Sequence, residues 1–411
     1  MHEVTDLTAA TRPVTAFSAR AGNPGAVPDL VGRAFATFAA GRPRPVHISI
    51  PIDVLALPAT GEWRTIAPPD RPRPEPGAVE RAATLLAEAR APLILVGGGA
   101  IGAANGIRRL AERLAAPVVS SIRGKGIVPD SHPLALGGAV CHPAGHELVA
   151  AADVVLAVGT ELSETDSFIE RLDIPGALIR VDIDPAKIDD RYRPAAAMVA
   201  DAKTAIEALD AALGGHPEAR KPAAGAVHER IAATRKRMST GLDHRERRHA
   251  VFLDALRAAL PADAMVFGDM CQVVYTGAFR FPVEAPGRWH YPAGFCTLGC
   301  ALPNAVGARL AAPRTPVVAL SGDGGFMFTC QELMTAAELE LPLPVIVWNN
   351  RGYQQIRDDM LARGQEPIGV GGATPGFEAL PPPSAPVFIG RATAPASRKR
   401  SRVPLRAPVR A

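Results

Sequence analysis

Cysteine, aromatic residues and unbalanced charge are all scarce in this sequence. The 411 residues include five cysteines and 5% Phe, Trp and Tyr, and the 45 basic and 41 acidic residues leave a formal net charge of +4. An odd number of cysteines without metal-finger spacing excludes a disulfide scaffold and indicates a reducing compartment, so we expect a cytoplasmic protein. The small charge excess indicates no nucleic-acid partner.

Long apolar runs are missing too. No stretch reaches the roughly 18 apolar residues that a membrane-spanning helix needs, and the first residues, MHEVTDLTAATRPVTAF, lack the basic-then-apolar order of a signal peptide. We therefore expect neither a membrane partner nor export. The 47% hydrophobic and 21% charged residues have the balance of a globular protein, and 411 residues suffice for two or three domains.

Changes in composition divide the chain into five segments. A Pro-rich connector begins near residue 58, a charged stretch starts with HPEARKP, and from Gly371 the sequence is rich in Pro, Ala and Arg without a hydrophobic period. We expect this last stretch to be a disordered or out-of-frame tail that does not pack. The expected segments are a first domain remnant at 1–60, a central domain at 75–215, a linker at 216–247, an incomplete last domain at 248–370 and the tail at 371–411.

Apolar runs and helical periods alternate through the middle of the chain. APLILVGGG indicates a buried strand that ends in glycines, and DVVLAVG and LIRVDID indicate further strands. Such alternation predicts an α/β fold, with multi-domain parallel sheets covered by helices. Gly97–Gly99 admits two interpretations, close approach to a nucleotide or tight packing after a strand, and the same two apply to Asp182 and Asp184.

Two histidines have a spacing that suits a metal site on a helix. His142 and His146 are four residues apart in CHPAGH. Pro143 and Gly145 argue against a helix, so we expect a loop here and no metal site.

The strongest motif follows an apolar strand late in the chain. PVVALSGDGGF places Gly322, Asp323, Gly324 and Gly325 just beyond a strand, where open α/β sheets bind ligands. Glycines let backbone N–H groups approach a phosphate, and a carboxylate beside them suits a divalent cation that bridges phosphate oxygens. About two dozen residues later, the next apolar strand ends in NNRG.

The two strand ends together predict a metal site. Neighbouring parallel strands lie about 5 Å apart, so Asp323 and Asn350 can reach one cation although helical sequence separates them. The oxygen of Asn350 and a carbonyl near Gly352 would complete the protein's share of an octahedron. We therefore expect Asp323, Asn350 and Gly352 to bind Mg²⁺, with the Oδ atoms of the first two within about 5 Å of each other.

The pattern of GDG followed by NN resembles the diphosphate-binding signature of thiamine-diphosphate enzymes. SIPIDV at 49–54, RVDIDP at 180–185 and GFCTLGCALPNAVGA at 294–308 are similar to the acetolactate synthase and pyruvate oxidase group, and the resemblance covers residues 1 to about 370. It implies a pyrimidine-binding domain, a central Rossmann-like domain and a diphosphate-binding domain, with thiamine diphosphate and Mg²⁺ as cofactors and assembly as a homodimer or homotetramer. Some relatives bind FAD in the central domain, which is not the favoured interpretation here.

The resemblance also implies roles for single residues. Leu298, in TLGCALP, matches the apolar residue that lies under the cofactor and bends it. The backbone carbonyl of Cys296 would accept a hydrogen bond from the cofactor's 4′-amino group, although the family usually has Gly there. Gln272 matches a glutamine near the diphosphate. The diphosphate itself would be held by Gly322, Gly324 and Gly325.

The activity that the resemblance implies is decarboxylation of a 2-oxo acid substrate. TRPVTAFS, RPRPVHISIP, GDMCQVVYTG and GYQQIRDDM make the chain most similar to the group that acts on 5-guanidino-2-oxopentanoate. The alternative is an acetolactate synthase-like carboligase. Val273 argues against it, because pyruvate-using members generally have His at this position.

A glutamate of the pyrimidine-binding domain activates the cofactor in this family. No acid of this chain matches it, since Glu3 stands in the wrong context. With the departure from the family pattern after about Gly369, this suggests a chain truncated at both ends. A further hypothesis therefore stays open, a non-catalytic remnant that dimerises or binds the cofactor poorly.

Overall fold

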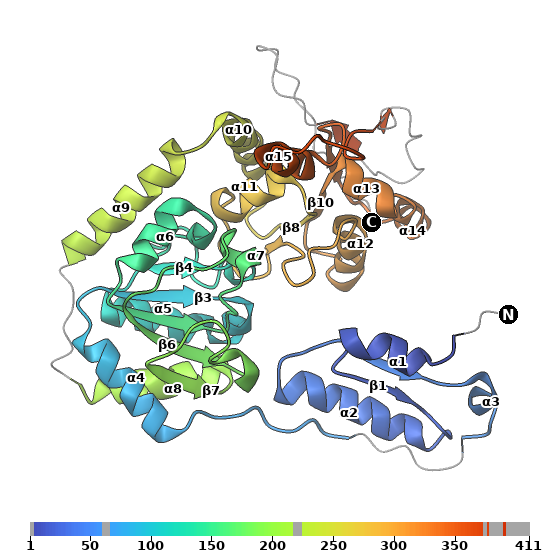
Figure 1. The fold of residues 1–411 in the computed structure, drawn as a ribbon, viewed down its shortest axis with the longest axis horizontal. Coiled ribbons are helices and arrows are strands. Elements are labelled where there is room, and N and C mark those ends of the chain that lie inside the picture. The colour runs from blue at the N-terminus through green and yellow to red at the C-terminus, as the bar shows by residue number, and fades with distance from the viewer. Residues whose placement is uncertain (1–3, 60–65, 217–223, 373–375, 378–388, 392–411) are drawn as a thin grey trace, which may run out of the picture. The chain divides into compact units, whose positions relative to one another are not determined.

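The computed structural model describes residues 4–59, 66–216, 224–372, 376–377 and 389–391 (Figure 1). The chain divides into two units, residues 1–240 with 284–286, and residues 241–283 with 287–411. In the described ranges no helix is both long and apolar enough to cross a membrane.

Unit 1 begins with a small two-stranded parallel sheet. Phe17 lies opposite Val46, and the second strand falls within the apolar run PVHISI. The first helix starts after Asp6, whose carboxylate accepts a 2.9 Å hydrogen bond from the Ala9 N–H and so caps the helix. The elements are α1 (Leu7–Thr11), η1 (Arg12–Val14), β1 (Phe17–Arg20), α2 (Ala26–Ala40), β2 (Val46–Ser49) and α3 (Ile52–Leu55).

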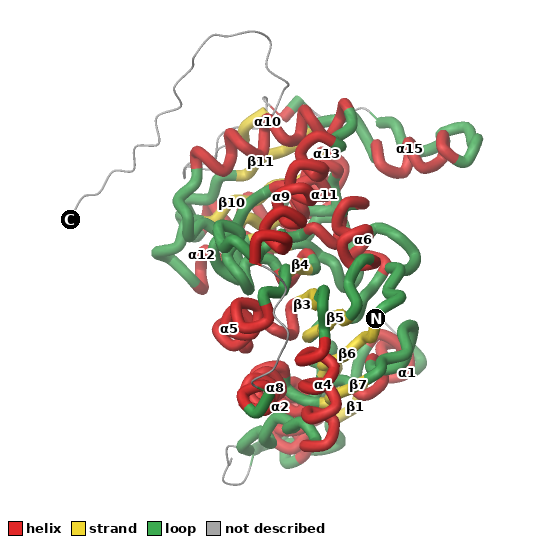
Figure 2. The backbone as a smooth tube through the Cα atoms, turned by 90° about the vertical axis from the view of Figure 1, so that its left-hand side faces the viewer, coloured by secondary structure: helices red, strands yellow, loops and turns green. Residues whose placement is uncertain are grey.

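A five-stranded parallel sheet forms the rest of unit 1, with the order β4-β3-β5-β6-β7. Its apolar strands are buried because helices cover both faces: α5 and α8 lie on one side and α6 on the other (Figure 2). The predicted α/β fold with parallel, helix-covered sheets is confirmed. The elements are α4 (Pro76–Glu88), β3 (Pro92–Val96), η2 (Gly98–Ala103), α5 (Ala104–Leu114), β4 (Val118–Ser120), η3 (Ile122–Gly124), η4 (Ala139–Cys141), α6 (Pro143–Ala150), β5 (Val154–Val158), α7 (Glu164–Ser167), β6 (Ala177–Asp182), η5 (Pro185–Lys187), β7 (Ala196–Val199) and α8 (Ala202–Gly214).

The strand order of this sheet reverses between β3 and β5. The loops after these two strands meet backbone to backbone: a Cβ at Gly97 would lie 2.3 Å from the Gly159 carbonyl oxygen. The N–H of Gly99 donates a 3.0 Å hydrogen bond to the same oxygen. Tight packing therefore accounts for the glycines at 97 and 99 without a nucleotide.

The histidine pair CHPAGH lies on a helix, so the expected loop is wrong. Helix α6 starts at Pro143, a position where the missing N–H of proline costs nothing. His142 caps it, because its Nδ1 accepts a 3.1 Å hydrogen bond from the Ala144 N–H. The ring of His146 is engaged by two backbone carbonyls, those of Val140 at 2.9 Å and Ser167 at 3.1 Å.

The stretch expected as a linker at 216–247 contains a helix from Ala224 onward. Residues 217–223 lie outside the described residues, but α9 (Ala224–Thr240) is a helix that contacts α6. It buries Val227, Ile231 and Met238, which recur along one face. The many Arg and Lys residues on the other face of α9 make this apolar face difficult to recognise in the sequence.

Unit 2 contains a second five-stranded parallel sheet, in the order β12-β11-β10-β8-β9. Gly322 lies opposite Trp348 in the pair β10 and β11, so these strands end level with each other. A buried cluster that includes Phe267, Leu302 and Phe326 forms its core. The elements are α10 (His244–Ala259), β8 (Met265–Gly268), α11 (Gln272–Arg280), β9 (Trp289–His290), α12 (Ala301–Ala311), β10 (Val317–Gly322), α13 (Asp323–Thr329), α14 (Glu332–Glu338), β11 (Val345–Trp348), α15 (Gln354–Ala362) and β12 (Ile389–Arg391).

The expectation that the chain stops packing at Gly371 is wrong at three points. Gly371 forms an antiparallel bridge with Gly352. Phe377 is 9% exposed and packs edge-on against Phe326, with ring centroids 5.6 Å apart. Strand β12 pairs in parallel with β11. Most of the expected tail, residues 373–375, 378–388 and 392–411, lies outside the described residues.

Candidate active site

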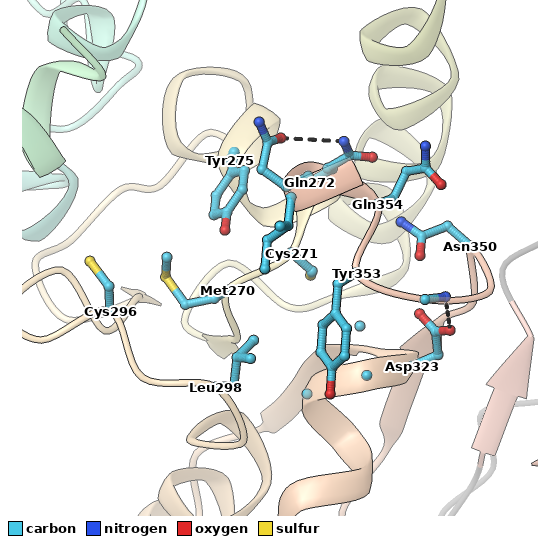
Figure 3. A pocket seen from close by; sticks show the side chains of 16 residues that line it. Met270, Cys271, Gln272, Tyr275, Cys296, Leu298, Asp323, Asn350, Tyr353 and Gln354 are labelled. Atoms are coloured by element: carbon cyan, nitrogen blue, oxygen red, sulfur yellow. Dashed lines mark hydrogen bonds between the residues drawn. The ribbon is translucent and has the colours of Figure 1, made fainter. Parts of the chain in front are cut away.

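An open pocket of about 210 Å³ lies at the carboxyl ends of β8, β10 and β11 in unit 2. Parallel α/β sheets bind ligands at this edge. Figure 3 shows Cys296 and Leu298 on one side of the pocket and Asp323 and Asn350 on the other. The structure brings all the sequence-predicted residues to this one pocket: Gln272, Cys296, Leu298, Gly322, Asp323, Gly324, Gly325, Asn350 and Gly352.

Sequence reasoning missed several residues of the pocket wall. Met270, Cys271 and Tyr275 lie beside Gln272, and residues 353–356 follow the NNRG turn. The segment GYQQI was available as a signal, because a helix that starts directly after a ligand-binding strand end places its first turn at the site. The aromatic ring of Tyr353 stands in the middle of the pocket in Figure 3.

Asp323 is 1% exposed and opens helix α13. Its Oδ2 accepts a 2.8 Å hydrogen bond from the backbone N–H of Gly352. Its Oδ1 lies 3.1 Å from one end of the Asn350 amide, and the same amide end lies 2.9 Å from the carbonyl oxygen of Gly352. The predicted closeness of Asp323 and Asn350 is confirmed, whereas metal binding by them stays a prediction.

The side-chain amide of Asn350 can take two orientations of the same shape, which exchange its oxygen and nitrogen atoms. With nitrogen inward it donates hydrogen bonds to Asp323 Oδ1 and to the Gly352 carbonyl. With oxygen inward, the amide oxygen lies 2.9 Å from the Gly352 carbonyl oxygen and 3.1 Å from Asp323 Oδ1. Neighbouring ligands of an octahedron with metal–oxygen contacts of about 2.1 Å are about 3.0 Å apart, so the donor set fits Mg²⁺ in that second orientation.

Protein packing alone requires glycine at two of the predicted positions. A Cβ at Gly324 would lie 2.7 Å from the ring of Tyr353, and one at Gly352 would lie 2.4 Å from the Val370 carbonyl oxygen. Gly352 also has a φ of +133°, which L side chains rarely adopt. The glycines thus shape the pocket wall independently of any phosphate.

The loop that carries Leu298 has unusual backbone angles. Cys296 has a φ of +55° and Gly299 a φ of +81°. A left-handed conformation favours glycine, which explains why the resemblance leads one to expect Gly at position 296. The cysteine keeps the backbone carbonyl that the resemblance assigns to cofactor binding.

Gln272 is only 6% exposed, and its amide nitrogen is engaged within the protein. Nε2 donates to Asp358 Oδ2 at 3.0 Å and to Gln355 Oε1 at 3.3 Å. Asp358 also accepts a 2.8 Å hydrogen bond from Gln354 and pairs with Arg245. These bonds fix the first turns of α15 against α11, and thereby fix the pocket wall.

The thiols around the pocket are held in their protonated form. Burial raises the pKa of Cys271, and burial followed by the charge of Asp269 raises the pKa of Cys300 to about 12. A thiol is a nucleophile only as its thiolate. We therefore assign these cysteines to packing.

Comparisons with known proteins agree with this geometry. Residues 79–209 match the thiamine pyrophosphate enzyme central domain, and residues 269–383 match the thiamine pyrophosphate enzyme C-terminal TPP-binding domain. The chain is 46% identical over 383 residues to the probable 2-ketoarginine decarboxylase AruI of Pseudomonas aeruginosa, covering 92% of this chain and 68% of that protein. The chain belongs to the thiamine pyrophosphate enzyme family.

Other thiamine pyrophosphate enzymes are more distant. The probable acetolactate synthase large subunit of Methanocaldococcus jannaschii is 32% identical over 363 residues, which are 82% of this chain and 60% of that protein. The acetolactate synthase isozyme 3 large subunit of Escherichia coli is 30% identical over 379 residues, 88% of this chain and 66% of that protein. The chain thus spans about two thirds or less of the length of these relatives. The family match runs to residue 383, beyond Gly371, where the resemblance was expected to end.

Proposed function

We propose that the pocket of unit 2 binds thiamine diphosphate together with Mg²⁺. The observation that carries the proposal is the position of the Asn350 amide, which lies 3.1 Å from Asp323 Oδ1 and 2.9 Å from the Gly352 carbonyl oxygen, both close to an octahedral edge. Asp323 and Asn350 would bind the cation through side chains and Gly352 through its carbonyl. The family match of residues 269–383 to a TPP-binding domain supports the choice of cofactor.

The other residues of the pocket would orient the cofactor. Leu298 supplies an apolar surface across the pocket from the metal ligands, and the carbonyl of Cys296 offers a hydrogen-bond acceptor on the same side. Gly322, Gly324 and Gly325 keep the diphosphate end free of side chains, and Gln272 holds the facing wall through Asp358. When bound, thiamine diphosphate supplies an electron sink for breaking the bond between a carboxylate and a carbonyl carbon.

We further propose that the substrate is 5-guanidino-2-oxopentanoate, which is 2-ketoarginine, and that the reaction is its decarboxylation. The name of the Pseudomonas aeruginosa relative supports this choice. A guanidinium cation pairs best with a carboxylate, which can accept two parallel hydrogen bonds. Helix α15, whose first turn lines the pocket, carries two carboxylates, Asp358 and Asp359.

Asp359 is the better suited of the two. Asp358 already pairs with Arg245, whereas among the residues that the structure describes no Lys or Arg pairs with Asp359. Its Oδ1 accepts a 3.0 Å hydrogen bond from Gln355, a residue of the pocket wall. Burial raises the pKa of Tyr275, and the charge of Asp359 adds to that rise after those of Cys271, Cys296 and Asp269.

Carboligation of the acetolactate synthase type is the second candidate, supported by the names of the more distant relatives. Val273 argues against it. Its side chain offers no polar group to a pyruvate-derived substrate, and the structure buries it fully beside Gln272 of the pocket wall.

The test is direct. The chain is titrated with thiamine diphosphate in a calorimeter with and without Mg²⁺, and is then assayed with 5-guanidino-2-oxopentanoate for CO₂ and 4-guanidinobutanal, and with pyruvate for acetolactate. We expect Mg²⁺-dependent binding and release of CO₂ from the guanidino acid; binding without release of CO₂ would favour the non-catalytic remnant that lacks the activating glutamate. Acetolactate without 4-guanidinobutanal would favour the second candidate, and no Mg²⁺-dependent binding would overturn the cofactor site.

Two variants test the substrate assignment. Asp359→Asn should lower kcat/KM for the guanidino acid by about tenfold or more, since it removes a charge-assisted pair. It should leave kcat/KM unchanged for a 2-oxo acid of similar length whose side chain carries no charge. Asp263→Asn, at an exposed carboxylate in the turn before β8, is the matched control and should change neither value. An equal effect of Asp359→Asn on both substrates would contradict the assignment.

We also propose that a second copy of the chain covers the face beside the pocket. Phe295 is 85% exposed, and Met327 and Phe328 of α13 are 46% and 55% exposed. Apolar side chains gathered next to a site mark an interaction surface. Sedimentation should find a dimer or tetramer, and the double variant Phe295→Ser, Phe328→Ser should shift it toward monomer; an unchanged assembly state would exclude this face.

A further inference from the structure

A buried carboxylate lies directly behind the pocket and is not part of its wall. Asp269 follows strand β8 and is 0% exposed. It is absent from the predicted metal donors, and among the described residues no Lys or Arg forms an ion pair with it. A carboxylate in such a place must have its charge balanced by hydrogen-bond donors.

Those donors come from three separate segments. Oδ1 accepts a 2.8 Å hydrogen bond from the Met270 N–H, and the Gly299 N–H lies 3.1 Å from Oδ1 and 3.0 Å from Oδ2. Oδ2 also accepts a 2.8 Å hydrogen bond from the Ser321 hydroxyl. One carboxylate therefore joins the end of β8, the loop of Leu298 and the end of β10.

The same carboxylate touches the glycine-rich turn. A Cβ at Gly325 would lie 2.5 Å from Asp269 Oδ2. The last glycine of the GDGG sequence is thus required by Asp269, whatever ligand the turn binds. This contact brings Asp269 against the helix that Asp323 opens.

The loop of Leu298 is held from the other side as well. The carbonyl of Gly299 accepts a 2.7 Å hydrogen bond from the Thr329 hydroxyl of α13. Gly299 is therefore fixed at its N–H by Asp269 and at its carbonyl by α13. Its neighbour Leu298 takes its place in the pocket from these two bonds.

We propose that Asp269 is a positioning residue for the cofactor, a role that rests on the proposed thiamine diphosphate site. Asp269 sets the distance between the apolar surface of Leu298 and the diphosphate end at the GDGG turn. Asp269 is not part of the pocket wall, so it acts through its bonds to Met270, Gly299 and Ser321 and its contact with Gly325.

The experiment compares Asp269→Ala and Asp269→Asn with the unchanged chain. Calorimetry measures the affinity for thiamine diphosphate and for inorganic pyrophosphate, both with Mg²⁺, and thermal unfolding monitors the fold. Asp269→Ala removes all the acceptors and should weaken thiamine diphosphate binding about ten- to a hundredfold. Asp269→Asn keeps the shape and one acceptor oxygen, and should recover most of that loss.

The affinity for inorganic pyrophosphate distinguishes a loss of cofactor positioning from a general loosening of the site. Pyrophosphate has no ring to rest on Leu298, so its affinity should fall much less than that of thiamine diphosphate. Asp201→Ala is the matched control, because Asp201 is a 9% exposed carboxylate that caps α8 in unit 1 through the N–H groups of Lys203 and Thr204. It should lower the unfolding temperature without changing either affinity.

Several outcomes would overturn the proposal. Equal losses for the two ligands would show loosening of the whole site, and full thiamine diphosphate affinity in a folded Asp269→Ala variant would show that the carboxylate positions nothing. If Asp269→Ala fails to fold, Ser321→Ala removes one arm of the network and must itself weaken thiamine diphosphate binding severalfold. Absence of binding by the unchanged chain would instead refute the proposed cofactor site.

Discussion

The backbone N–H of Gly352 donates a 2.8 Å hydrogen bond to Asp323 Oδ2 and so ties the loop after β11 to the end of β10. The bond requires an unusual backbone at Gly352, with a φ of +133° and the Val370 carbonyl oxygen 2.4 Å from where a Cβ would be. The same backbone turns the Gly352 carbonyl toward Asn350. The backbone conformation at Gly352 therefore fixes the positions of all three predicted metal ligands relative to one another.

Gly352→Ala should break that geometry. The added methyl group meets the Val370 carbonyl, so the loop must move and carry the Gly352 carbonyl away from Asn350. We expect Mg²⁺-dependent affinity for thiamine diphosphate to fall about tenfold or more in a calorimetric titration. Gly364→Ala is the control, because Gly364 also has a positive φ of +69° but has open space around it. Equal affinities of the two variants would contradict the prediction.

Cys296→Gly should stabilise unit 2 or leave it unchanged. A non-glycine residue in the left-handed region costs about 1 kcal/mol, and glycine removes that strain at the expense of a more flexible unfolded chain. The backbone carbonyl remains, so cofactor affinity should stay the same. Cys296→Val, with a β-branched side chain at the same φ, should lower the unfolding temperature. A glycine variant less stable than the valine variant would refute this account.

His249 should make unit 2 sensitive to acid. The side chain is 2% exposed, and burial, with the nearby Arg245 and Arg248 charges, lowers its pKa to about 4 from 6.5. The folded state therefore disfavours protonation, and the stability that a neutral His249 gives is complete above pH 6.5 and is lost as the pH falls toward 4. The total loss is on the order of 3 kcal/mol.

The measurement is urea unfolding, followed by a signal from unit 2, between about pH 7.5 and 5.5, roughly one unit to either side of the pKa of an unperturbed histidine. His249→Asn can keep the 2.9 Å hydrogen bond to Thr276 without the titrating ring, so its stability should vary less with pH. His244→Asn, at an exposed position of the same helix, should vary as the unchanged chain does. Identical pH dependence in all three proteins would exclude His249 as the source.

Phe377→Ala should destabilise unit 2 by about 3 kcal/mol, because it removes a buried ring from the core. Phe377 is 9% exposed and packs on Phe326. Ile368→Ala, at a residue that is 77% exposed, is the control and should change the unfolding free energy by about 0.5 kcal/mol or less. A negligible effect of Phe377→Ala on the denaturant midpoint would show that this part of the expected tail does not contribute to the core of unit 2.

The sequence was most informative where chemistry follows directly after a strand. Asp323 and Asn350 were found because each ends an apolar run, and parallel strands bring such ends together without further knowledge of packing. Asp269 also follows a strand, yet its partners Gly299 and Ser321 are distant in sequence. Nothing in local pattern shows that three segments converge on one carboxylate.

The errors of the sequence analysis have physical causes. In α9 the charged residues outnumber the buried apolar ones, so the apolar face is hard to recognise in the sequence. Phe377 is a single buried aromatic residue in a Pro-rich segment, where no hydrophobic period indicates packing. The segment CHPAGH was expected to be a loop because Pro143 disfavours a helix interior. At the first position of a helix that penalty vanishes. The cap formed by His142 then favours a helix over a loop at this segment.

The contact between Gly97 and Gly159 closes the central sheet at the place where doubly wound sheets commonly open a crevice for a nucleotide. A dinucleotide entering there would have to separate main chains that are bonded to each other. No side chain can swing aside to make room, since neither glycine has one. The hydrogen bond and the close contact thus tie the loops after β3 and β5 directly to each other at the carboxyl edge of the central sheet.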